Sequence, residues 1–419
     1  MPDGTQSTRH VVVVGAGVIG INVAVALRRR GLAVTVVDER GPGLGTSFGN
    51  AGCIATAEIT PISMPGLIWQ VPRMLMDPLG PLAIRWSYLP QLAPWLWRFW
   101  RAGTPARVRG ITASLGSLVG RAWTDWNEVI ADARIDDLIV RQGALFVYAT
   151  EKGLRAGDEE WALRRSHGVK TEEIDAAAIR ELEPALSPRF QHGYFIPDWG
   201  HVLDPHRVVV RLADHLRALG GEIRVARAQD ITFVDGRPAA LLLDGSDTLA
   251  FDALAICGGA WSRKLCRRVA GDVPLDTERG YNTTLPNPGV KLTRPVCPAE
   301  SSFLMTPMNE GLRIGGAVEL AGLEAPANFA RARALLALGR QALPALNTEG
   351  GREWMGFRPS MPDSMPVISL SPCHGNVALA FGHGHLGLTE AATTGRLVAE
   401  MLSGAPTAID VRPFRVDRF

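Results

Sequence analysis

The stretch HVVVVGAGVIGINVAVALRRRGLAVTVVDER, residues 10–40, decides the fold of this 419-residue chain. It opens with a run of valines that is typical of a strand buried on both faces. A glycine-rich turn and a helix to Arg30 follow, and Gly31 ends the helix. Leu32–Val37 then form a second strand, with Asp38 at its tip. This order predicts a βαβ unit and an α/β fold.

The turn of this unit has the spacing G-x-G-x-x-G. The first glycine allows a tight turn, the second lets a pyrophosphate approach the backbone, and the third lets helix and strand pack closely. The free N–H groups of the helix start favour phosphate, and the acid at the second strand tip can accept hydrogen bonds from a ribose diol. Both NAD and FAD fit, because each carries an ADP moiety, whereas a carboxylate disfavours NADP. The predicted cofactor contacts here are Gly15, Gly17, Val18, Ile19, Gly20, Asp38, Glu39 and Arg40.

Length and composition exclude several classes of protein. At roughly 100–200 residues per domain, the chain holds two or three domains. A net charge of +2 gives no general attraction to nucleic acid. Five cysteines without a C-x-x-C pair argue against a disulfide framework and a zinc site, and favour a reducing, cytoplasmic location. The uncharged stretch Val11–Leu27 is too short and too glycine-rich for a membrane span.

Two further stretches suggest that something flat lies against the main chain. TSFGNAGC, residues 46–53, contains small polar residues and no clear period. GHGHLGLT, residues 382–389, has glycines on both sides of two histidines, and Thr389 is a plausible cap for a helix over Glu390–Leu402. The H-x-H spacing lacks a third metal ligand, so we predict no metal site.

Together these stretches resemble the FAD-dependent amino-acid oxidoreductase family that includes D-amino-acid oxidase and glycine oxidase. TSFGNAG is most similar to the small subunit of bacterial D-amino-acid dehydrogenase. The resemblance covers nearly the whole chain and implies a Rossmann-like FAD-binding domain with a discontinuous, antiparallel-sheet substrate domain of α+β type. We expect the FAD-binding domain to comprise residues 8–65, 200–273 and 352–412, and the substrate domain residues 66–199 and 274–351.

The resemblance also implies FAD contacts in four segments. The loop along the pyrophosphate and the ribityl chain would use hydroxyl, amide and backbone groups. The strand and turn GGEIRVARAQDI would contact the adenine through Gln229 or its neighbour, and the buried strand FDALAICGGAWS would end close to the cofactor. The C-terminal helix start would face the flavin edge where negative charge develops on reduction. The residues so implied are Thr46, Ser47, Asn50, Ala51, Gly52, Gln229, Cys257, Gly258, Gly259, His385, Gly387, Leu388 and Thr389.

For the substrate, the resemblance points to Arg358 in GFRP as the partner of an amino-acid carboxylate, which a guanidinium can hold with two hydrogen bonds. Tyr281 in ERGYN is either a substrate hydrogen-bond donor or a half-buried strand aromatic. His383 is a further candidate that would face the substrate.

Residues 59–124 differ in character from the rest of the chain. They contain seven arginines, one acid and six tryptophans, including the segment LAPWLWRFWRAG. The pattern is typical of amphipathic helices that cover the substrate domain. The alternative is peripheral contact of residues 65–101 with an anionic membrane, on the inner face of a bacterial inner membrane.

The predicted activity is oxidation of the Cα–N bond of a D-amino acid or a cyclic imino acid, such as D-alanine, D-proline or a hydroxyproline. The likeness to the dehydrogenase favours a quinone or a partner subunit as electron acceptor, with oxygen as the alternative. Other readings are an NADPH-dependent monooxygenase, an NAD-dependent dehydrogenase and a non-catalytic flavin-carrying subunit. The oligomeric state is left open.

Overall fold

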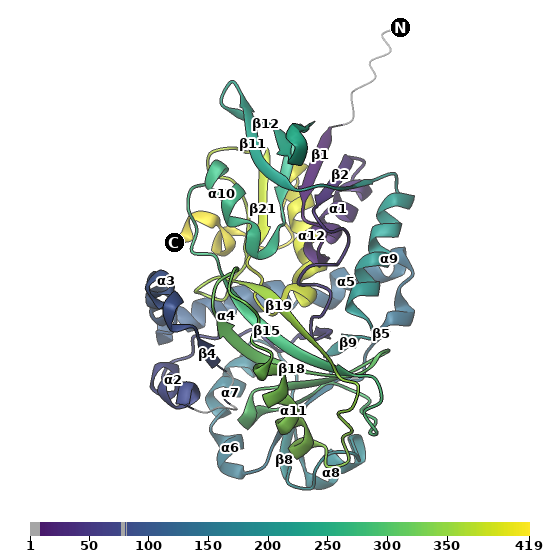
Figure 1. The fold of residues 1–419 in the computed structure, drawn as a ribbon, viewed down its shortest axis with the longest axis vertical. Coiled ribbons are helices and arrows are strands. Elements are labelled where there is room, and N and C mark those ends of the chain that lie inside the picture. The colour runs from purple at the N-terminus through teal and green to yellow at the C-terminus, as the bar shows by residue number, and fades with distance from the viewer. Residues whose placement is uncertain (1–8, 77–79, 81) are drawn as a thin grey trace.

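The computed structural model describes residues 9–76, 80 and 82–419. The chain is built around two large sheets, one in the upper and one in the lower half of Figure 1. The predicted βαβ unit is confirmed as β1 (His10–Val14), α1 (Val18–Arg29) and β2 (Ala33–Asp38).

The upper sheet has six strands in the order β10-β2-β1-β14-β21-β20. Its strands are parallel except β20, which runs antiparallel to β21. Both faces are covered: Val11 and Val13 of β1 pack in one apolar cluster, and Val12 and Val14 pack in another. The remaining strands are β10 (Glu222–Val225), β14 (Ala253–Ile256), β20 (Val367–Leu370) and β21 (Val377–Phe381).

Helices lie on both faces of this sheet, as its two buried faces require. On one face, α1 packs along α12 so closely that a Cβ on Gly395 would lie 2.7 Å from the backbone oxygen of Asn22. That face also carries α9, and the other carries α10 and a small three-stranded sheet. These elements are α9 (Pro205–Ala218), α10 (Arg263–Val269), α12 (Gly387–Leu402), β11 (Ala228–Val234), β12 (Arg237–Leu243) and β13 (Thr248–Ala250).

The lower sheet has nine strands and is antiparallel except at β16–β6 and β18–β4, which agrees with the predicted substrate domain. Its order is β19-β15-β18-β17-β16-β6-β8-β7, with β4 beside β18. The strands are β4 (Leu82–Ile84), β6 (Ala144–Tyr148), β7 (Glu172–Asp175), β8 (His192–Ile196), β15 (Asp276–Leu285), β16 (Val296–Pro298), β17 (Leu304–Met308), β18 (Gly311–Leu320) and β19 (Arg352–Ser360).

Two segments pack differently from the domain division expected above. β19 belongs by its pairing with β15 to the lower sheet, although residues 352–412 were assigned to the upper domain. The helices α4 (Pro105–Val119) and α5 (Ala122–Ala133), assigned to the substrate domain, pack on α12, and Trp126 of α5 donates to the Leu388 carbonyl at 3.0 Å. Apolar burial against the upper sheet decides their place.

The remaining elements surround the lower sheet or connect the two halves. A small sheet joins β3, β9 and β5, and α11 packs on the lower sheet. No helix of the described segments is long and apolar enough to cross a bilayer. The elements are α2 (Leu67–Met76), α3 (Leu89–Ala102), α6 (Glu151–Arg155), α7 (Asp158–Ser166), α8 (Ala176–Leu182), α11 (Ala330–Ala342), β3 (Cys53–Ile54), β5 (Ile139–Val140) and β9 (Gly200–Val202).

Candidate functional site

An elongated cavity of about 2140 Å³ lies between the two large sheets. Its walls come from segments far apart in the sequence: the start of α1, the tip of β2, the loop 45–53, the stretches 226–228 and 256–265, strands β15 and β19, and the start of α12. Most of the residues predicted to contact a dinucleotide therefore line one space.

The glycine turn after β1 is shaped by contacts within the protein. Gly15 has φ +103°, and a Cβ there would lie 2.5 Å from the Cys257 oxygen. A Cβ on Gly20 would lie 1.8 Å from the Gly15 oxygen, so Gly20 lets α1 pack on the turn, as predicted for the third glycine, and does not line the cavity. Gly17, with Val18 and Ile19, lines it. The turn thus leaves the first backbone N–H groups of α1 beside the cavity.

Asp38 joins two turns at the end of β2. Its carboxylate accepts hydrogen bonds from the backbone N–H groups of Ala16 (2.8 Å), Arg40 (2.8 Å) and Gly41 (2.9 Å). A carboxylate has about four lone-pair positions, so one more donor can be accepted. Asp38, Glu39 and Arg40 line the cavity, and a ribose contact at this place stays a prediction.

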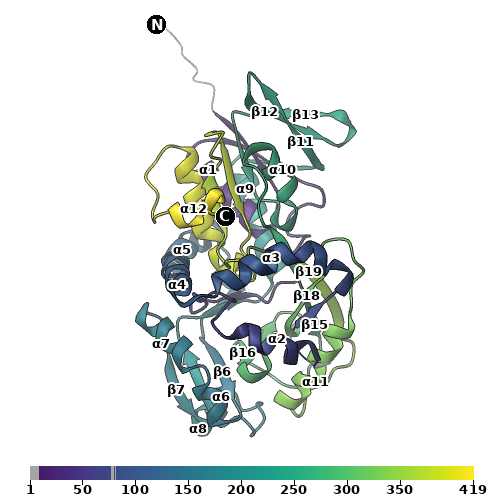
Figure 2. The same cartoon turned by 90° about the vertical axis from the view of Figure 1, so that its left-hand side faces the viewer.

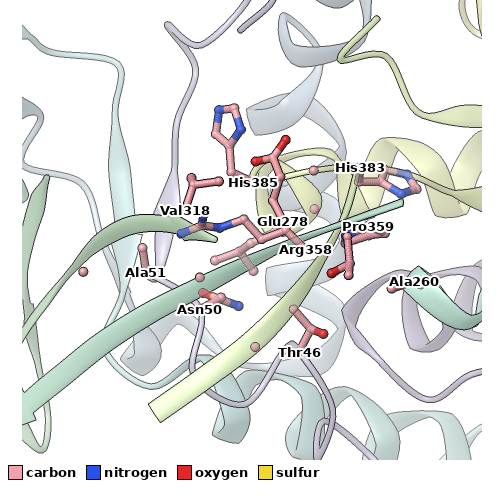
Figure 3. Close-up of a pocket in the computed structure, with 18 of the residues that line it drawn as sticks. Thr46, Asn50, Ala51, Ala260, Glu278, Val318, Arg358, Pro359, His383 and His385 are labelled. Carbon is pink, nitrogen blue, oxygen red and sulfur yellow. The ribbon is translucent and has the colours of Figure 1, made fainter. Parts of the chain in front are cut away.

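The loop 46–52 lines the cavity through Thr46, Ser47, Asn50, Ala51 and Gly52 (Figure 3 labels three of them). At two positions of this loop, the small residue has a cause other than the expected approach of a cofactor. A Cβ on Gly49 would lie 2.3 Å from the Trp354 indole, and one on Gly52 would lie 2.8 Å from Met308 Cε. These two glycines are required by protein neighbours.

Hydrogen bonds attach this loop to both halves of the molecule. The Ser47 hydroxyl accepts from the Val18 N–H at the start of α1 (3.0 Å). From the lower sheet, Asn282 donates to the Gly49 carbonyl and Arg313 to the Asn50 carbonyl, both at 2.7 Å. The loop is therefore held between the two sheets.

The start of α12 also faces the cavity. The helix begins at Gly387 with no side-chain cap, and Gly387 and Leu388 line the cavity. The prediction that Thr389 is the cap was wrong, because the helix starts two residues earlier. The Thr389 hydroxyl instead accepts from the Ala55 N–H at 2.9 Å and does not line the cavity. The positive end of the α12 dipole is thus directed at the space.

The segment after β10 approaches the cavity one residue earlier than predicted. Ala226, Arg227 and Ala228 line it, whereas Gln229 is exposed on β11 and does not. The turn after β10 brings only its first residues to the cavity. Cys257, Gly258 and Gly259 line the cavity as expected.

Arg358 extends from β19 across the face of β15. A Cβ on Gly280 would lie 2.6 Å from the Arg358 guanidinium carbon, so the absence of a side chain at 280 makes room for it. Among the described residues it makes one long hydrogen bond, to the Ala317 carbonyl at 3.4 Å, and no ion pair. Desolvation lowers its pKa. A guanidinium surrounded by protein and with so few partners favours an anionic ligand.

Tyr281 borders the cavity, but its ring packs in an apolar cluster beside Phe329, which favours the alternative of a strand aromatic; a role as substrate donor stays a prediction. Its side chain is 1 % exposed, its hydroxyl donates to Glu319, and it accepts from the Asn328 N–H at 2.9 Å. Arg279 lies on the same face of β15 and donates to the Gly322 carbonyl at 2.7 Å. Both hydrogen-bonding positions of the tyrosine are used by the protein.

His383 lines the cavity and is held by the protein, and a contact with the substrate stays a prediction. Its ring is 3 % exposed, and its Nε2 lies 3.0 Å from the Thr394 hydroxyl of α12. Burial lowers its pKa to about 3. The His385 side chain is exposed to the cavity. Because the cavity is itself enclosed by protein, burial lowers the pKa of His385 to about 4. Figure 3 shows His385 near Glu278 and Arg358, with His383 apart from them.

Glu278 is a cavity residue that the sequence analysis missed. It lies directly opposite Arg358 in the register of β15 and β19, and it lines the cavity. Alternation along β15 places Glu278, Gly280 and Asn282 on the cavity face and Arg279 and Tyr281 on the other. The alternation of residues along ERGYN would have placed Glu278 at the cavity if the buried face of the strand had been known.

A second charged group forms a wall of the same cavity. Arg164 of α7 pairs with Glu58 at 3.1 Å and with Glu160 at 2.7 Å, so its charge is compensated by the protein. Across the described parts of the chain, no cluster of three histidine, cysteine or acidic side chains is placed to hold a metal ion. Arg358, in contrast, makes no ion pair with the described residues.

Comparison with known proteins agrees with this arrangement. A family model described as "DAO: FAD dependent oxidoreductase" matches residues 10–401. The chain is 37% identical to a D-amino-acid oxidase of Bradyrhizobium diazoefficiens over 100% of both chains. It is 30% identical to a D-amino acid dehydrogenase of the same bacterium over 98% of both.

Solved structures share the fold at low identity. Glycine oxidase from Geobacillus kaustophilus superposes with a TM-score of 0.70 at 20% identity, covering 98% of this chain and 100% of that one. L-proline dehydrogenase from P. horikoshii gives a TM-score of 0.72 at 17% identity, covering 98% of each. At these identities the likeness establishes the arrangement of the two sheets.

Proposed function

The chain belongs to the FAD-dependent oxidoreductase family, and on this premise we propose that it oxidises the Cα–N bond of a D-amino acid or a cyclic imino acid. The full-length relatives named as D-amino-acid oxidase and D-amino acid dehydrogenase support this substrate class. Oxidation of a D-amino acid gives an imino acid, which water hydrolyses to a 2-oxo acid and ammonia; a cyclic substrate gives a cyclic imine, whose nitrogen stays attached to the chain.

The residues that line the cavity fit FAD. The turn at Gly15–Gly17 and the start of α1 would hold the pyrophosphate, and Asp38 or Glu39 the adenosine ribose. The loop 46–52 would follow the ribityl chain, and the uncapped start of α12 would stabilise negative charge on the reduced ring. When bound, FAD supplies the acceptor for two electrons and one hydrogen from the substrate carbon.

The observation that carries the proposal is the poorly paired guanidinium of Arg358 in this cavity. It would hold the substrate carboxylate with two charge-assisted hydrogen bonds and so fix the direction of the Cα–H bond. Because the hydride acceptor is the cofactor, positioning is the main task of the protein. The proposed reaction does not require a nucleophilic side chain of the protein.

We propose further that the surface of α3 docks on an anionic membrane, where a quinone would take the electrons. Trp97 and Trp100 are 57% and 48% exposed, and Arg98 and Arg101 beside them are exposed. Figure 2 shows α3 across the surface of the molecule, close to α2, which borders the cavity through Leu67 and Met74. Residues 77–79 and 81 of the predicted contact segment 65–101 lie outside the described residues.

Anaerobic mixing with a panel of D- and L-amino acids, proline and hydroxyproline isomers tests the proposed function. We expect at least one member to bleach the visible flavin absorbance of the holoenzyme. Arg358→Ala should keep the yellow colour and raise the substrate concentration for half-maximal bleaching by about 10–150-fold, since a hydrogen bond to a charged group contributes roughly 1.5–3 kcal/mol. Arg352→Ala, in an exposed part of the same strand, is the matched control.

Four outcomes would contradict the proposal or a part of it. A holoenzyme that stays oxidised with every compound would favour the flavin-carrying subunit. Bleaching by NADPH alone would favour a monooxygenase. Unchanged saturation in Arg358→Ala would remove this residue from the substrate site. Reoxidation by air at the rate of turnover would replace the quinone by oxygen as the acceptor.

A further inference from the structure

Glu278 and Arg358 carry opposite charges but form no direct ion pair among the described residues. They are direct cross-strand neighbours on β15 and β19, and both line the cavity. Side chains at such positions have Cβ atoms roughly 4.5–5.5 Å apart, so an ion pair is within reach of their length. Yet among the described residues Glu278 makes neither a hydrogen bond nor an ion pair, although it is 7% exposed.

A carboxylate that is this buried needs compensation, because transfer of a charged group from water is strongly unfavourable. His385 does not provide it, since burial lowers its pKa to about 4 and leaves the ring neutral at physiological pH. Arg164 does not provide it either, because its charge is paired with Glu58 and Glu160. The Glu278 carboxylate thus faces the cavity beside Arg358 with room for a hydrogen-bond donor from a ligand.

The spacing of the two charges matches one class of ligand. An α-amino acid carries its carboxylate and its nitrogen on the same carbon, so an adjacent cation and anion can meet both groups at once. We propose, resting on the proposed function, that Glu278 binds the substrate nitrogen while Arg358 binds the carboxylate, and that Glu278 stabilises the positive charge that forms on this nitrogen.

The charge balance of the reaction gives Glu278 a catalytic task. The neutral amine R–CH(NH2)–COO⁻ loses its Cα hydrogen with both bonding electrons to the oxidised flavin. The nitrogen lone pair forms the new C=N bond, and the product is R–C(=NH2⁺)–COO⁻. The nitrogen thus changes from neutral to positive in this step. The attraction between a fixed carboxylate and this nitrogen is therefore stronger in the transition state than in the ground state, which is the condition for raising the rate.

The substitution Glu278→Gln tests this in the holoenzyme with two measurements: one should show a loss and the other a gain. The first is the rate of anaerobic flavin reduction at saturating amino acid, which should fall by about tenfold or more. The second is the dissociation constant of propionate, which has a carboxylate and no amine, followed by perturbation of the flavin spectrum. Propionate should bind more tightly to Glu278→Gln, because a neighbouring negative charge that repels it is removed.

Two variants serve as controls. Arg358→Ala should weaken both the amino acid and propionate, because it removes the carboxylate partner. Glu353→Gln changes an exposed carboxylate on the same strand β19, paired with Arg333 at 3.3 Å, and should leave both measurements unchanged.

The outcomes separate this inference from the function on which it rests. If no amino acid reduces the wild-type flavin, the proposed function fails and takes this inference with it. If wild type is reduced but Glu278→Gln is reduced equally fast, the role of Glu278 at the nitrogen is rejected. If Glu278→Gln weakens propionate as well, the glutamate acts by shaping the place of Arg358, and the inference is overturned.

Discussion

At the scale of single residues, the burial of His201 makes the stability of the fold depend on pH. The ring lies in β9 and is 1 % exposed, and its Nδ1 has no hydrogen-bond partner in the part of the chain that the structure describes. Desolvation lowers its pKa from 6.5 to about 4. Between these values the unfolded chain binds a proton that the folded chain does not, so the free energy of unfolding falls as the pH falls through this window.

We therefore expect His201→Gln to flatten the pH dependence of stability. The lowered pKa corresponds to roughly 3 kcal/mol of stability, lost between pH 6.5 and about pH 4. Urea unfolding at pH 7.5, 5.5 and 4.5 would measure it for both proteins. His167→Gln, at an exposed histidine, is the control. Equal slopes for wild type and His201→Gln would show that this residue titrates alike in both states.

Single-residue chemistry was also where the sequence analysis was least reliable. Arg358 was placed in the cavity because its charge and the family resemblance agreed. ERGYN by itself does not tell which face of the strand is buried, so the sequence leaves both interpretations of Tyr281 open and does not single out Glu278. A tyrosine hydroxyl and a glutamate are both plausible ligands, and the partner strands β18 and β19, distant in sequence, decide between them.

At the scale of elements, the flat centre of β15 determines where Arg358 lies. A methyl group on Gly280 would approach the guanidinium carbon to 2.6 Å, and the flexible arginine would have to move. We expect Gly280→Ala to fold, since the displaced group is the end of a flexible side chain. The substrate concentration that gives half the maximal rate should rise by about tenfold, because a displaced guanidinium loses one of its two hydrogen bonds to the carboxylate.

Steady-state kinetics together with thermal unfolding would check Gly280→Ala. Gly110→Ala on α4, where none of the described atoms lies within 4 Å of the added carbon, is the control: it should leave half-saturation unchanged and raise stability by about 1 kcal/mol, because alanine favours a helix interior. An unchanged half-saturation in Gly280→Ala would show that Arg358 has a second productive position.

Elements defined by local sequence were predicted well. The β1-α1-β2 unit depends on a valine run, three glycines and a strand within about thirty residues, and its bounds differ from the prediction by one residue. The start of α12 was predicted incorrectly. Thr389 has a hydroxyl suited to a helix cap, but this hydroxyl accepts a hydrogen bond from the Ala55 N–H, 334 residues away in the sequence. Such long-range hydrogen bonds leave no local pattern.

At the scale of the whole molecule, the exposed aromatic and basic surface of α3 predicts binding to anionic lipid. Arg98→Gln with Arg101→Gln should weaken binding to vesicles of phosphatidylcholine and phosphatidylglycerol by about 30-fold, as each arginine near such a surface contributes roughly 1 kcal/mol. Trp97→Ser with Trp100→Ser should weaken binding to the same vesicles by removing interfacial contacts.

Co-sedimentation with the vesicles would measure this. Arg207→Gln with Arg237→Gln, at exposed arginines on α9 and β12, should leave sedimentation unchanged. Sedimentation of wild type that is no greater than with phosphatidylcholine alone would contradict the membrane proposal.

The global arrangement was predicted from the family resemblance, whereas the sequence by itself indicated a βαβ unit. The assignment of β19 to the upper domain shows the limit, because a strand between two halves of a chain can join either sheet. Its pairing along the whole of β15 decided the matter. The same uncertainty applied to α4 and α5, whose apolar faces fit α12.

The loop 46–52 has a consequence for how the molecule can move. It is tied to α1 through Ser47, to β15 and β18 through Asn282 and Arg313, and to β9 through the Val202 N–H, which donates to the Gly52 carbonyl at 2.7 Å. A hinge between the two halves would have to break these bonds together. We therefore expect ligands to enter and leave without a movement of one sheet against the other, so that the cavity keeps its geometry before the substrate arrives.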